Sequence, residues 1–218
     1  MVRQSRQLGD HHPANAFLAD MGLGKSLQTI CIVASKHQER RASLQASGAK
    51  QVSHLPSLIV CPPTLIGHWY HEILKFTDNL NPFKYFGSSK EREGLRRQFS
   101  KYDVIVTSYE VVRADVEALR RIPFLYCVLD EGHIIKNGKG KLSMAIKALQ
   151  SNHRLILSGT PIQNNVLELW SLFDFLMPGF LGSEKLFNER FSKPILANRD
   201  AKATARQSEA GELVRSMP

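Results

Sequence analysis

The chain has 218 residues, of which 43% are hydrophobic, and its formal net charge is +9 at pH 7. This hydrophobic content suits one packed domain and is too high for a disordered chain. No apolar run approaches the ~20 residues that span a bilayer, and residues 1–20 lack the apolar core of a signal peptide, so we expect neither a membrane protein nor a secreted one.

Short apolar runs alternate with segments of helical periodicity in the first third of the chain. The run at 16–19 leads into a glycine-rich turn, and the spacing of apolar residues predicts a helix over 26–34. The polar stretch 37–57 is expected to be a surface loop or the ragged end of that helix. A buried strand is predicted at 58–61, where prolines end it, and a helix is predicted over 65–76.

The same alternation continues through the rest of the chain. Strands are predicted at 104–106, 124–129 and 154–157. An amphipathic helix is predicted over 142–149 and a strongly apolar helix over 166–176. Strands that are apolar on both faces and alternate with helices are typical of α/β proteins, in which helices cover both faces of a mostly parallel sheet. We therefore predict this fold class.

Polar segments follow the predicted strands at the point where each strand ends. Ligands of parallel sheets bind beyond these carboxyl ends. We therefore expect segments that are distant in the chain to lie side by side along one edge of the sheet and to form a site there. These segments are Asp20–Ser26, Pro62–Thr64, Thr107–Ser108, Asp130–His133 and Ser158–Thr160.

Residues 19–26 (ADMGLGKS) match the phosphate-binding loop G-x-x-x-x-G-K-[ST], except that alanine stands at the first glycine position. Glycines in such a loop let backbone N–H groups turn toward phosphate oxygens, and the helix that follows adds its positive end. Lys25 is placed to neutralise the β- and γ-phosphates, and Ser26 to hold Mg²⁺. The predicted nucleotide-binding residues are Gly22, Leu23, Gly24, Lys25, Ser26, Leu27 and, from a later segment, His133.

Two carboxylates, Asp130 and Glu131, come directly after a predicted strand. A strand-end aspartate of a phosphate-binding-loop protein holds Mg²⁺, and an adjacent glutamate can deprotonate the attacking water. A solvated acidic turn is the alternative, but it does not explain why the pair follows an apolar run. We predict Lys25, Asp130 and Glu131 as catalytic residues and Ser26 and Asp130 as metal ligands. Coupling of the γ-phosphate to the rest of the domain is predicted for His133 with Ser158, Gly159, Thr160 and Gln163.

Basic residues are concentrated at 84–101 and at 136–147, and the second segment carries four lysines and no acidic residue. A basic surface favours a polyanion as partner. Each segment is equally consistent with an ordinary solvated helix face, and the sequence leaves both interpretations open.

Taken together, the motifs resemble the Swi/Snf-type branch of the superfamily-two helicase-like ATPases. The resemblance implies a RecA-like phosphate-binding-loop domain that uses ATP and Mg²⁺. It also implies hydrolysis that is stimulated by DNA, and movement along double-stranded DNA without strand separation. The similar segments are 20–29 (motif I), 61–65 with Trp69 (motif Ia), Thr107-Ser108-Tyr109, Asp-Glu-Gly-His at 130–133 (motif II) and Ser-Gly-Thr-Pro-Ile-Gln-Asn-Asn at 158–165 (motif III).

The resemblance also implies the partners of the chain. Contacts of the first lobe with the DNA backbone position the protein without reading sequence. Three segments, 129–137, 167–182 and 193–200, resemble the subfamily that removes TATA-binding protein from DNA, which implies a nuclear protein that acts on transcription complexes. A recombination translocase of the same branch shares Gly132 and stays an alternative. The residues that would face DNA phosphates are Pro63, Thr64, Thr107 and Ser108, with Lys136 as a further candidate.

The family pattern implies an ATP-binding lobe at 16–194, an irregular segment at 1–15 before it, and a loosely held tail at 195–218 that leads toward a second RecA-like lobe absent from this chain. The chain also departs from the family in having one acidic residue fewer before Met21. The second lobe supplies an arginine finger, whose absence costs roughly 10³–10⁵ in turnover. We therefore expect the chain alone to bind ATP and to hydrolyse it poorly.

Two other functions fit parts of the sequence. A non-catalytic nucleotide- or DNA-binding module needs only Lys25, Ser26 and the basic segments. A small phosphate-binding-loop kinase or GTPase is disfavoured, because the sequence has neither an arginine-rich lid nor the Asn-Lys-x-Asp motif that reads guanine.

Overall fold

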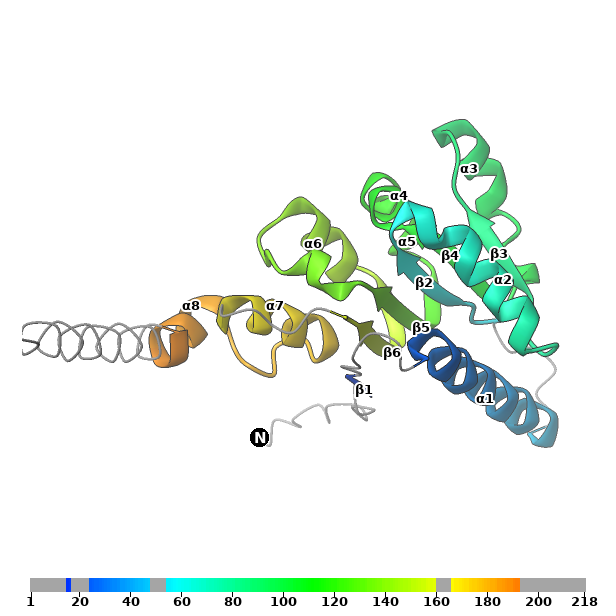
Figure 1. Cartoon of the computed structure of the whole chain (residues 1–218), viewed down its shortest axis with the longest axis horizontal. Coiled ribbons are helices and arrows are strands. Elements are labelled where there is room, and N and C mark those ends of the chain that lie inside the picture. Colours follow the sequence, from blue (N-terminus) through cyan, green and yellow to red (C-terminus); the bar gives the residue numbers. More distant parts are fainter. Residues whose placement is uncertain (1–14, 17–23, 48–53, 160–165, 193–218) are drawn as a thin grey trace, which may run out of the picture.

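The computed structural model describes residues 15–16, 24–47, 54–159 and 166–192. A six-stranded parallel sheet runs through this part of the chain, in the order β1-β6-β5-β2-β4-β3 (Figure 1). The predicted fold class is therefore confirmed. The strands are β1 (Asn15–Ala16), β2 (Ser57–Cys61), β3 (Pro82–Tyr85), β4 (Val104–Ser108), β5 (Pro123–Asp130) and β6 (Gln150–Leu157).

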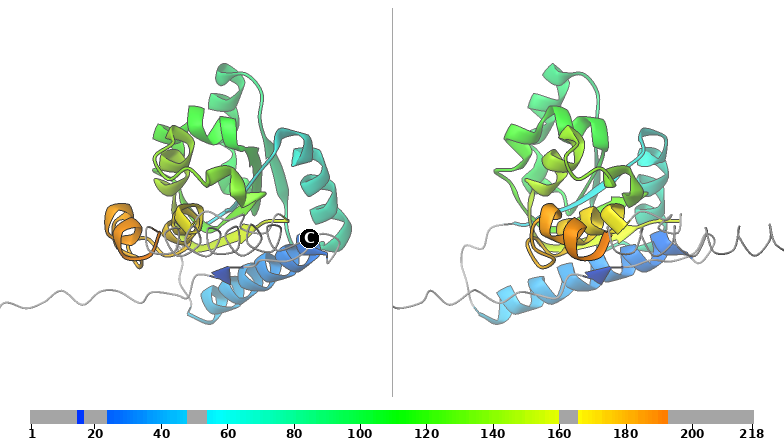
Figure 2. Two further views of the ribbon diagram at one scale, coloured as in Figure 1. Left: turned by 60° about the vertical axis from the view of Figure 1, so that its left-hand side comes forward. Right: turned by 90° about the vertical axis from the view of Figure 1, so that its left-hand side faces the viewer.

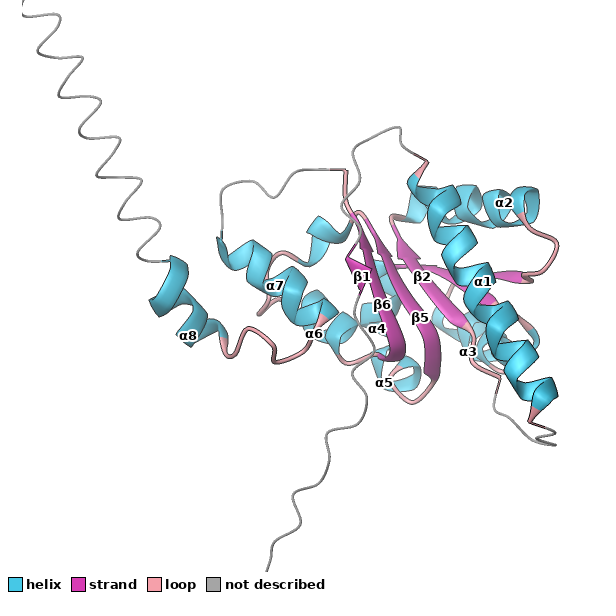
Figure 3. Cartoon of the chain, turned by 90° about the horizontal axis from the view of Figure 1, so that it is seen from below, coloured by secondary structure: helices cyan, strands magenta, loops and turns pink. Residues whose placement is uncertain are grey.

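Helices cover both faces of the sheet (Figure 3). Two long ones lie on one face: α1 (Lys25–Ala46) and α2 (Ile66–Phe76). The other face carries α4, α6 and α7, and α8 lies at the side of the molecule away from α2 (Figures 1 and 2). The remaining helices are α3 (Ser89–Arg96), α4 (Tyr109–Ala114), α5 (Val116–Leu119), α6 (Lys141–Lys147), α7 (Val166–Leu176) and α8 (Glu184–Phe187), with short turns η1 (Pro63–Leu65), η2 (Phe99–Lys101), η3 (Gly132–Ile135) and η4 (Asn188–Ser192).

Strand β2 shows why helices cover both faces of the sheet. Its side chains alternate between the faces, and all five of its residues are buried. Leu58 and Val60 pack into the core under α4, α6 and α7, whereas Ile59 and Cys61 pack into the core under α1 and α2. A strand that is apolar at every position is thus the signature of a central strand in this fold. Within the described residues, no helix is long and apolar enough to cross a membrane.

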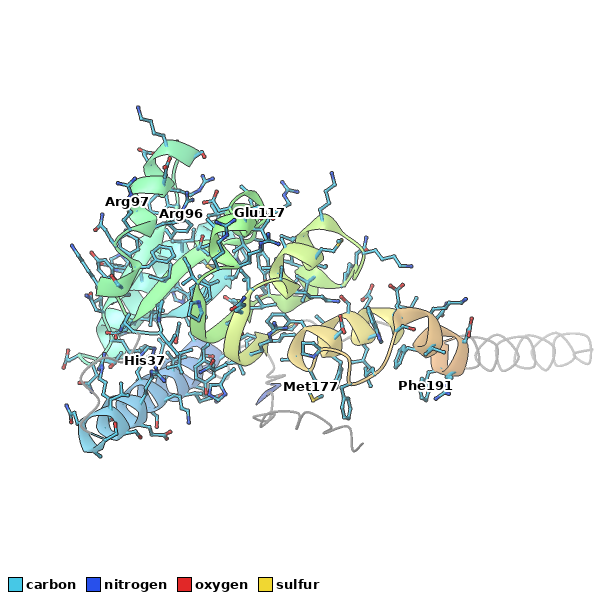
Figure 4. The ribbon with its side chains drawn as sticks, turned by 180° about the vertical axis from the view of Figure 1, so that it is seen from behind. His37, Arg96, Arg97, Glu117, Met177 and Phe191 are labelled. Carbon is cyan, nitrogen blue, oxygen red and sulfur yellow. The ribbon has the colours of Figure 1, made fainter. Side chains whose placement is uncertain are left out.

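Helix α1 differs from the prediction because it continues twelve residues beyond Ala34, to Ala46. The extension is held by polar groups that turn toward the sheet. His37 is buried and shares a hydrogen bond of 2.9 Å between its Nε2 and Ser57 Oγ (Figure 4). One turn later, Arg41 Nη2 donates to Asp103 Oδ1 at 2.6 Å. The polar stretch thus begins as a continuation of the helix, as one of the two predicted alternatives had it, and most of its polar side chains are exposed while His37 and Arg41 hold it to the sheet.

Burial of His37 makes the stability of the fold depend on pH. Burial lowers the pKa of the imidazole from 6.5 to about 4; the charge of Asp103 opposes this shift, whereas Arg41, His54 and Arg40 add to it. Between pH 6.5 and 4 the unfolded chain binds a proton at this residue that the folded chain does not bind. The folded state therefore loses about 3 kcal/mol from this residue as pH falls through that window.

The substitution His37→Gln should remove this pH dependence. We expect the free energy of unfolding of the variant, measured by urea titration at several pH values, to fall less steeply between pH 6.5 and 4 than that of the wild type. The exposed His71 provides the control, because His71→Gln should leave the wild-type slope unchanged. Equal slopes for the wild type and His37→Gln would contradict the assignment.

The basic segment 84–101 is partly turned inward. Arg92 is buried and donates to both carboxylate oxygens of Asp115, from Nε at 2.7 Å and from Nη2 at 2.9 Å. Arg96 Nη1 lies 3.1 Å from the same carboxylate, and Tyr85 donates its hydroxyl hydrogen to it (Figure 4). These arginines therefore join α3 to the segment between α4 and α5, and they are not part of a solvated basic face.

Candidate functional site

The carboxyl ends of five strands lie in one row across the sheet. Ala16 pairs with Ile156, Ile156 with Leu129, Leu129 with Val60, and Val60 with Thr107. Neighbouring strands are about 4.8 Å apart, so β1 and β5, with β6 between them, lie roughly 10 Å apart. The strands that the predicted segments follow therefore end at the same side of the sheet.

The structure describes the predicted phosphate-binding loop only from Gly24 onward. Gly24 has φ 68°, in the left-handed region that favours glycine, and α1 begins at the next residue. Lys25, Ser26 and Leu27 form the first turn of α1, with the first two partly exposed. The predicted residues Gly22, Leu23, Thr160 and Gln163 lie outside the described residues.

Asp130 is held in place by two aromatic residues. Trp69, fully buried on α2, donates its Nε1 hydrogen to Asp130 Oδ2 at 2.8 Å. The backbone N–H of Glu131 donates to the other carboxylate oxygen at 3.0 Å, and Tyr109 donates to the Asp130 carbonyl at 2.8 Å. The carboxylate therefore has a fixed orientation at the strand end.

Charges around Asp130 connect it to the phosphate-binding loop. Burial raises the pKa of its carboxyl group above the usual value; the hydrogen bond from Trp69 opposes the rise, and the charge of Glu131 adds to it. The positive charge of Lys25 lowers the same pKa. Lys25 and Asp130 therefore interact electrostatically across the edge of the sheet, although they are far apart in the chain.

Glu131 stands in a strained turn. It is the single non-glycine residue with positive φ in the described part of the chain, at φ 55° and ψ 48°. Such a conformation costs about 1–3 kcal/mol and persists where the surroundings impose it. The next residue must be glycine, because a Cβ atom on Gly132 would overlap Cγ2 of Ile156 on β6. His133 Nδ1 lies 3.2 Å from Glu131 Oε2, without a hydrogen bond between them.

Ser26 and Asp130 offer a hydroxyl and a carboxylate oxygen, which are the donors that Mg²⁺ prefers. No group of three histidine, cysteine or acidic side chains that could enclose a metal occurs among the described residues. Sites for Mg²⁺ typically use one or two protein ligands and are completed by substrate phosphates and water. The residues present therefore fit Mg²⁺ bound together with a nucleotide.

Ser158 and Gly159 directly follow β6, the strand that lies between β1 and β5 in the sheet. Ser158 is buried, and the residue before it, Leu157, pairs with Asp130 in the sheet. The predicted coupling segment thus begins directly beside Asp130. This places Ser158 where the prediction required it; its role in coupling stays a prediction.

The residues predicted to face DNA divide into two groups. Pro63 and Thr64 are exposed at the start of α2, and Lys136 is exposed and lies 3.7 Å from Glu168. Thr107 and Ser108 are buried: Thr107 donates its hydroxyl hydrogen to the Tyr85 carbonyl at 2.8 Å, and the Ser108 hydroxyl caps α4. Both hydroxyls therefore already have a partner within the fold, and a contact of these two residues with DNA stays a prediction.

Sequence reasoning missed the contact between Trp69 and Asp130. In the sequence, Trp69 belongs to the segment that resembles motif Ia and to the helix predicted over 65–76, and neither pattern assigns a partner to its indole. A buried tryptophan nevertheless has an N–H group that needs an acceptor, and this requirement was the available signal. The periodicity of α2 could not identify an acceptor 61 residues away.

Comparison with known proteins gives a consistent result. The family described as "SNF2-related domain" matches residues 5–217. The chain is 59% identical over 194 residues to the TATA-binding protein-associated factor mot1 of Schizosaccharomyces pombe, covering 89% of this chain and 10% of that protein. It is 58% identical over 196 residues to the human TATA-binding protein-associated factor 172, covering 89% of this chain and 11% of that protein.

A solved structure supports the same relationship. The SWI2/SNF2 ATPase core of Sulfolobus solfataricus in complex with double-stranded DNA is similar with a TM-score of 0.70 and 35% identity, over 86% of this chain and 37% of that chain. The chain thus spans about a tenth of the length of its two curated relatives and about a third of the solved ATPase core.

Proposed function

This chain belongs to the family of SNF2-related domains, and from that membership we propose that it is the ATP-binding lobe of a DNA-dependent ATPase that moves along double-stranded DNA. The observation that carries the proposal is geometric: β1, which precedes the loop, and β5, which ends at Asp130, end at the same side of the sheet, and Lys25 begins the helix that follows β1. A lysine at the start of a helix and a strand-end aspartate are the two groups that a phosphate-binding-loop ATPase needs beside the triphosphate.

Each predicted site residue has a role in the proposed reaction. The backbone at Gly22, Leu23, Gly24 and Leu27 and the Lys25 ammonium bind the phosphates, and Ser26 and Asp130 would hold Mg²⁺. The bound metal would neutralise charge that develops on the β- and γ-phosphates. Glu131 accepts the proton of the water that attacks the γ-phosphorus, while the bond to the β,γ-bridging oxygen breaks. Trp69 keeps Asp130 oriented, and His133, Ser158, Gly159, Thr160 and Gln163 transmit the state of the γ-phosphate.

Double-stranded DNA is the proposed nucleic-acid partner. The exposed Pro63, Thr64 and Lys136 are the proposed contacts with its backbone, and the relative from Sulfolobus solfataricus, whose solved structure contains DNA, supports this. The second RecA-like lobe is proposed to supply the rest of the ATP cleft, so that the chain alone binds ATP and turns it over slowly.

The names of the curated relatives support a more specific function. Both are TATA-binding protein-associated factors, at 58–59% identity, whereas an ISWI chromatin-remodelling ATPase of Arabidopsis thaliana is 38% identical over 181 residues. We therefore propose that the complete protein acts in the nucleus and removes TATA-binding protein from DNA.

Binding of ATP by the substitution Lys25→Ala tests the proposed site. We expect the dissociation constant for Mg·ATP, measured by isothermal titration calorimetry, to rise by roughly 10- to 100-fold, since one charge-assisted interaction is lost. Lys90, exposed on α3, provides the control, and Lys90→Ala should bind ATP like the wild type. Unchanged affinity in Lys25→Ala would refute the nucleotide site. Tight binding without DNA-stimulated hydrolysis, once the second lobe is attached, would identify a non-catalytic nucleotide-binding module.

A further inference from the structure

Two buried hydroxyl groups converge on one backbone carbonyl next to the catalytic turn. Ser171 Oγ, on α7, donates to the Ile135 carbonyl at 2.7 Å. Ser143 Oγ, on α6, donates to the same oxygen at 3.0 Å. Ile135 is the last residue of η3, the turn that begins directly after Glu131. The position of this turn is therefore fixed from two helices.

The segment that follows the turn lies against α7 over several residues. A Cβ atom on Gly138 would come within 3.0 Å of the Trp170 ring and 3.4 Å of Ser171 Oγ, so a side chain at this position would push these atoms away by a few tenths of an ångström. Lys136 Nζ lies 3.7 Å from Glu168 Oε1. Residues 135–138 thus contact α7 through the main chain as well as through side chains.

Ion pairs add to the contact between residues 135–138 and α7. They also account for most of the lysines of the basic segment 136–147. Lys147 Nζ lies 2.8 Å from Asp174 Oδ2 and 4.8 Å from the centre of the Trp170 ring. Lys139 lies 3.2 Å from Glu184 of α8. Most lysines of 136–147 therefore face acidic residues of α7 and α8, and α6 lies beside α7 in the structure (Figures 1 and 3).

The turn is held on its opposite side by the sheet. Gly132 is pressed against Ile156 of β6, so the turn cannot move toward β6 without displacing that strand. The turn that follows the strained backbone at Glu131 thus contacts β6 at Gly132 and α7 at Ile135. A closely packed element of this kind transmits a shift instead of absorbing it, because well-packed interiors have low compressibility.

Ser143 and Ser171 differ in what they connect to the turn. Ser143 is eight residues from Ile135, on the next helix of the chain, so its bond is local. Ser171 is 36 residues away, on a helix that begins at Val166, shortly after the segment that starts at Ser158. Helix α7 is therefore connected to the site twice: along the chain from the end of β6, and through Ser171 to the turn after β5.

We propose that Ser171 is a positioning residue that couples α7 to the turn carrying Glu131 and His133. Binding of a nucleoside triphosphate at the sheet edge and the position of α7 are then linked. A partner that shifts α7 then changes the affinity of the chain for the nucleotide. By thermodynamic reciprocity, the nucleotide changes the affinity for that partner by the same factor. This inference rests on the proposed nucleotide site.

The two tryptophans of the chain are suited to test the coupling separately from binding. Trp69 touches Asp130, and Trp170 stands on α7 next to Ser171. Labelling with 5-fluorotryptophan gives one ¹⁹F resonance for each, and the substitution Trp170→Phe assigns them. Addition of Mg²⁺ and the non-hydrolysable β,γ-imido analogue of ATP should shift both resonances in the wild type.

The substitution Ser171→Ala should preserve the Trp69 shift and abolish the Trp170 shift. Ser143→Ala is the matched control, since it removes the other hydroxyl from the same carbonyl at similar burial. It should preserve both shifts. Either variant leaves the Ile135 carbonyl one donor, so a small and similar loss of stability is expected, and denaturant titration checks that both are folded.

The pattern of ¹⁹F shifts separates failure of the proposed coupling from failure of the proposed nucleotide site. A Trp170 shift in Ser171→Ala equal to that of the wild type overturns the coupling role of Ser171, as does loss of the shift in both serine variants. A wild type in which Trp69 responds and Trp170 does not also overturns the coupling, while leaving the nucleotide site intact. If neither resonance responds, the nucleotide site itself fails, and the coupling fails with it. The measurement on the wild type tests the coupling even if one of the serine variants does not fold.

Discussion

The substitution Glu131→Gln should reduce DNA-stimulated ATP hydrolysis by about 10²- to 10⁴-fold while ATP still binds. The amide keeps the size and the hydrogen-bonding capacity of the side chain but cannot accept a proton from the attacking water. The assay is phosphate release with and without duplex DNA, in a protein that joins this chain to a second RecA-like lobe of the family. Calorimetry on the same variant should give a dissociation constant for Mg·ATP close to that of the wild type.

The structure gives reasons to expect a clean separation of binding from turnover. Glu131 is partly exposed, so its replacement removes no core packing. Its left-handed backbone is tolerated by glutamine about as well as by glutamate, because both have the same β-carbon geometry. The control is Glu93→Gln on exposed α3, which changes the net charge equally and should hydrolyse ATP at the wild-type rate. If the Glu131 variant kept full DNA-stimulated activity, another group would have to be the base.

The substitution Asp115→Ala should destabilise the chain by about 3–5 kcal/mol. The Asp115 carboxylate is buried and accepts hydrogen bonds from Arg92, Arg96 and Tyr85. Burial alone would raise the pKa of this carboxyl group, but the hydrogen bonds from Arg92 and Tyr85 hold it below its usual value. Without the carboxylate, a buried guanidinium is left without its counter-charge, which costs more than the pair contributes.

Denaturant titration measures this effect as a lower transition midpoint at an unchanged slope. Asp78→Ala serves as the control, since Asp78 is exposed and its loss should change stability by less than about 0.5 kcal/mol. The double substitution Arg92→Ala, Asp115→Ala should cost less than the sum of the single substitutions, because the unpaired charge disappears with Arg92. A loss below about 1 kcal/mol for Asp115→Ala would show that the cluster is solvated and loosely held.

Several elements could be predicted from the sequence because their signals are local. The apolar runs at 58–61, 104–106, 124–129 and 154–157 all lie within strands, and the helix predicted over 166–176 has these bounds in the structure. Burial on both faces requires apolar side chains at consecutive positions, so a short sequence window carries the information. Strand β3 escaped prediction because this short outer strand combines a proline and a lysine with two aromatic residues.

The same reasoning explains the misinterpreted polar segments. Arg41 and Asp103 are 62 residues apart, and neither the length of α1 nor the burial of His37 is visible without that contact. Likewise, Thr107 and Ser108, which the family resemblance places toward DNA phosphates, are buried. Their hydroxyls are used by a neighbouring strand and by the helix they begin. The presence of a polar residue in the sequence indicates that its side chain needs a hydrogen-bond partner. It does not indicate whether that partner is water or another residue of the protein.

By itself, the sequence determined the fold class and the side of the sheet at which the predicted polar segments follow their strands. Alternating strands and helices leave few topologies and direct the polar strand ends to one side. Only the tertiary structure decided how those residues are held. The Trp69 contact with Asp130, the strained turn at Glu131 and the bond from Ser171 to Ile135 each join segments, or depend on neighbours, that are distant in the chain. Such contacts depend on packing geometry in three dimensions, which no local pattern of residues specifies.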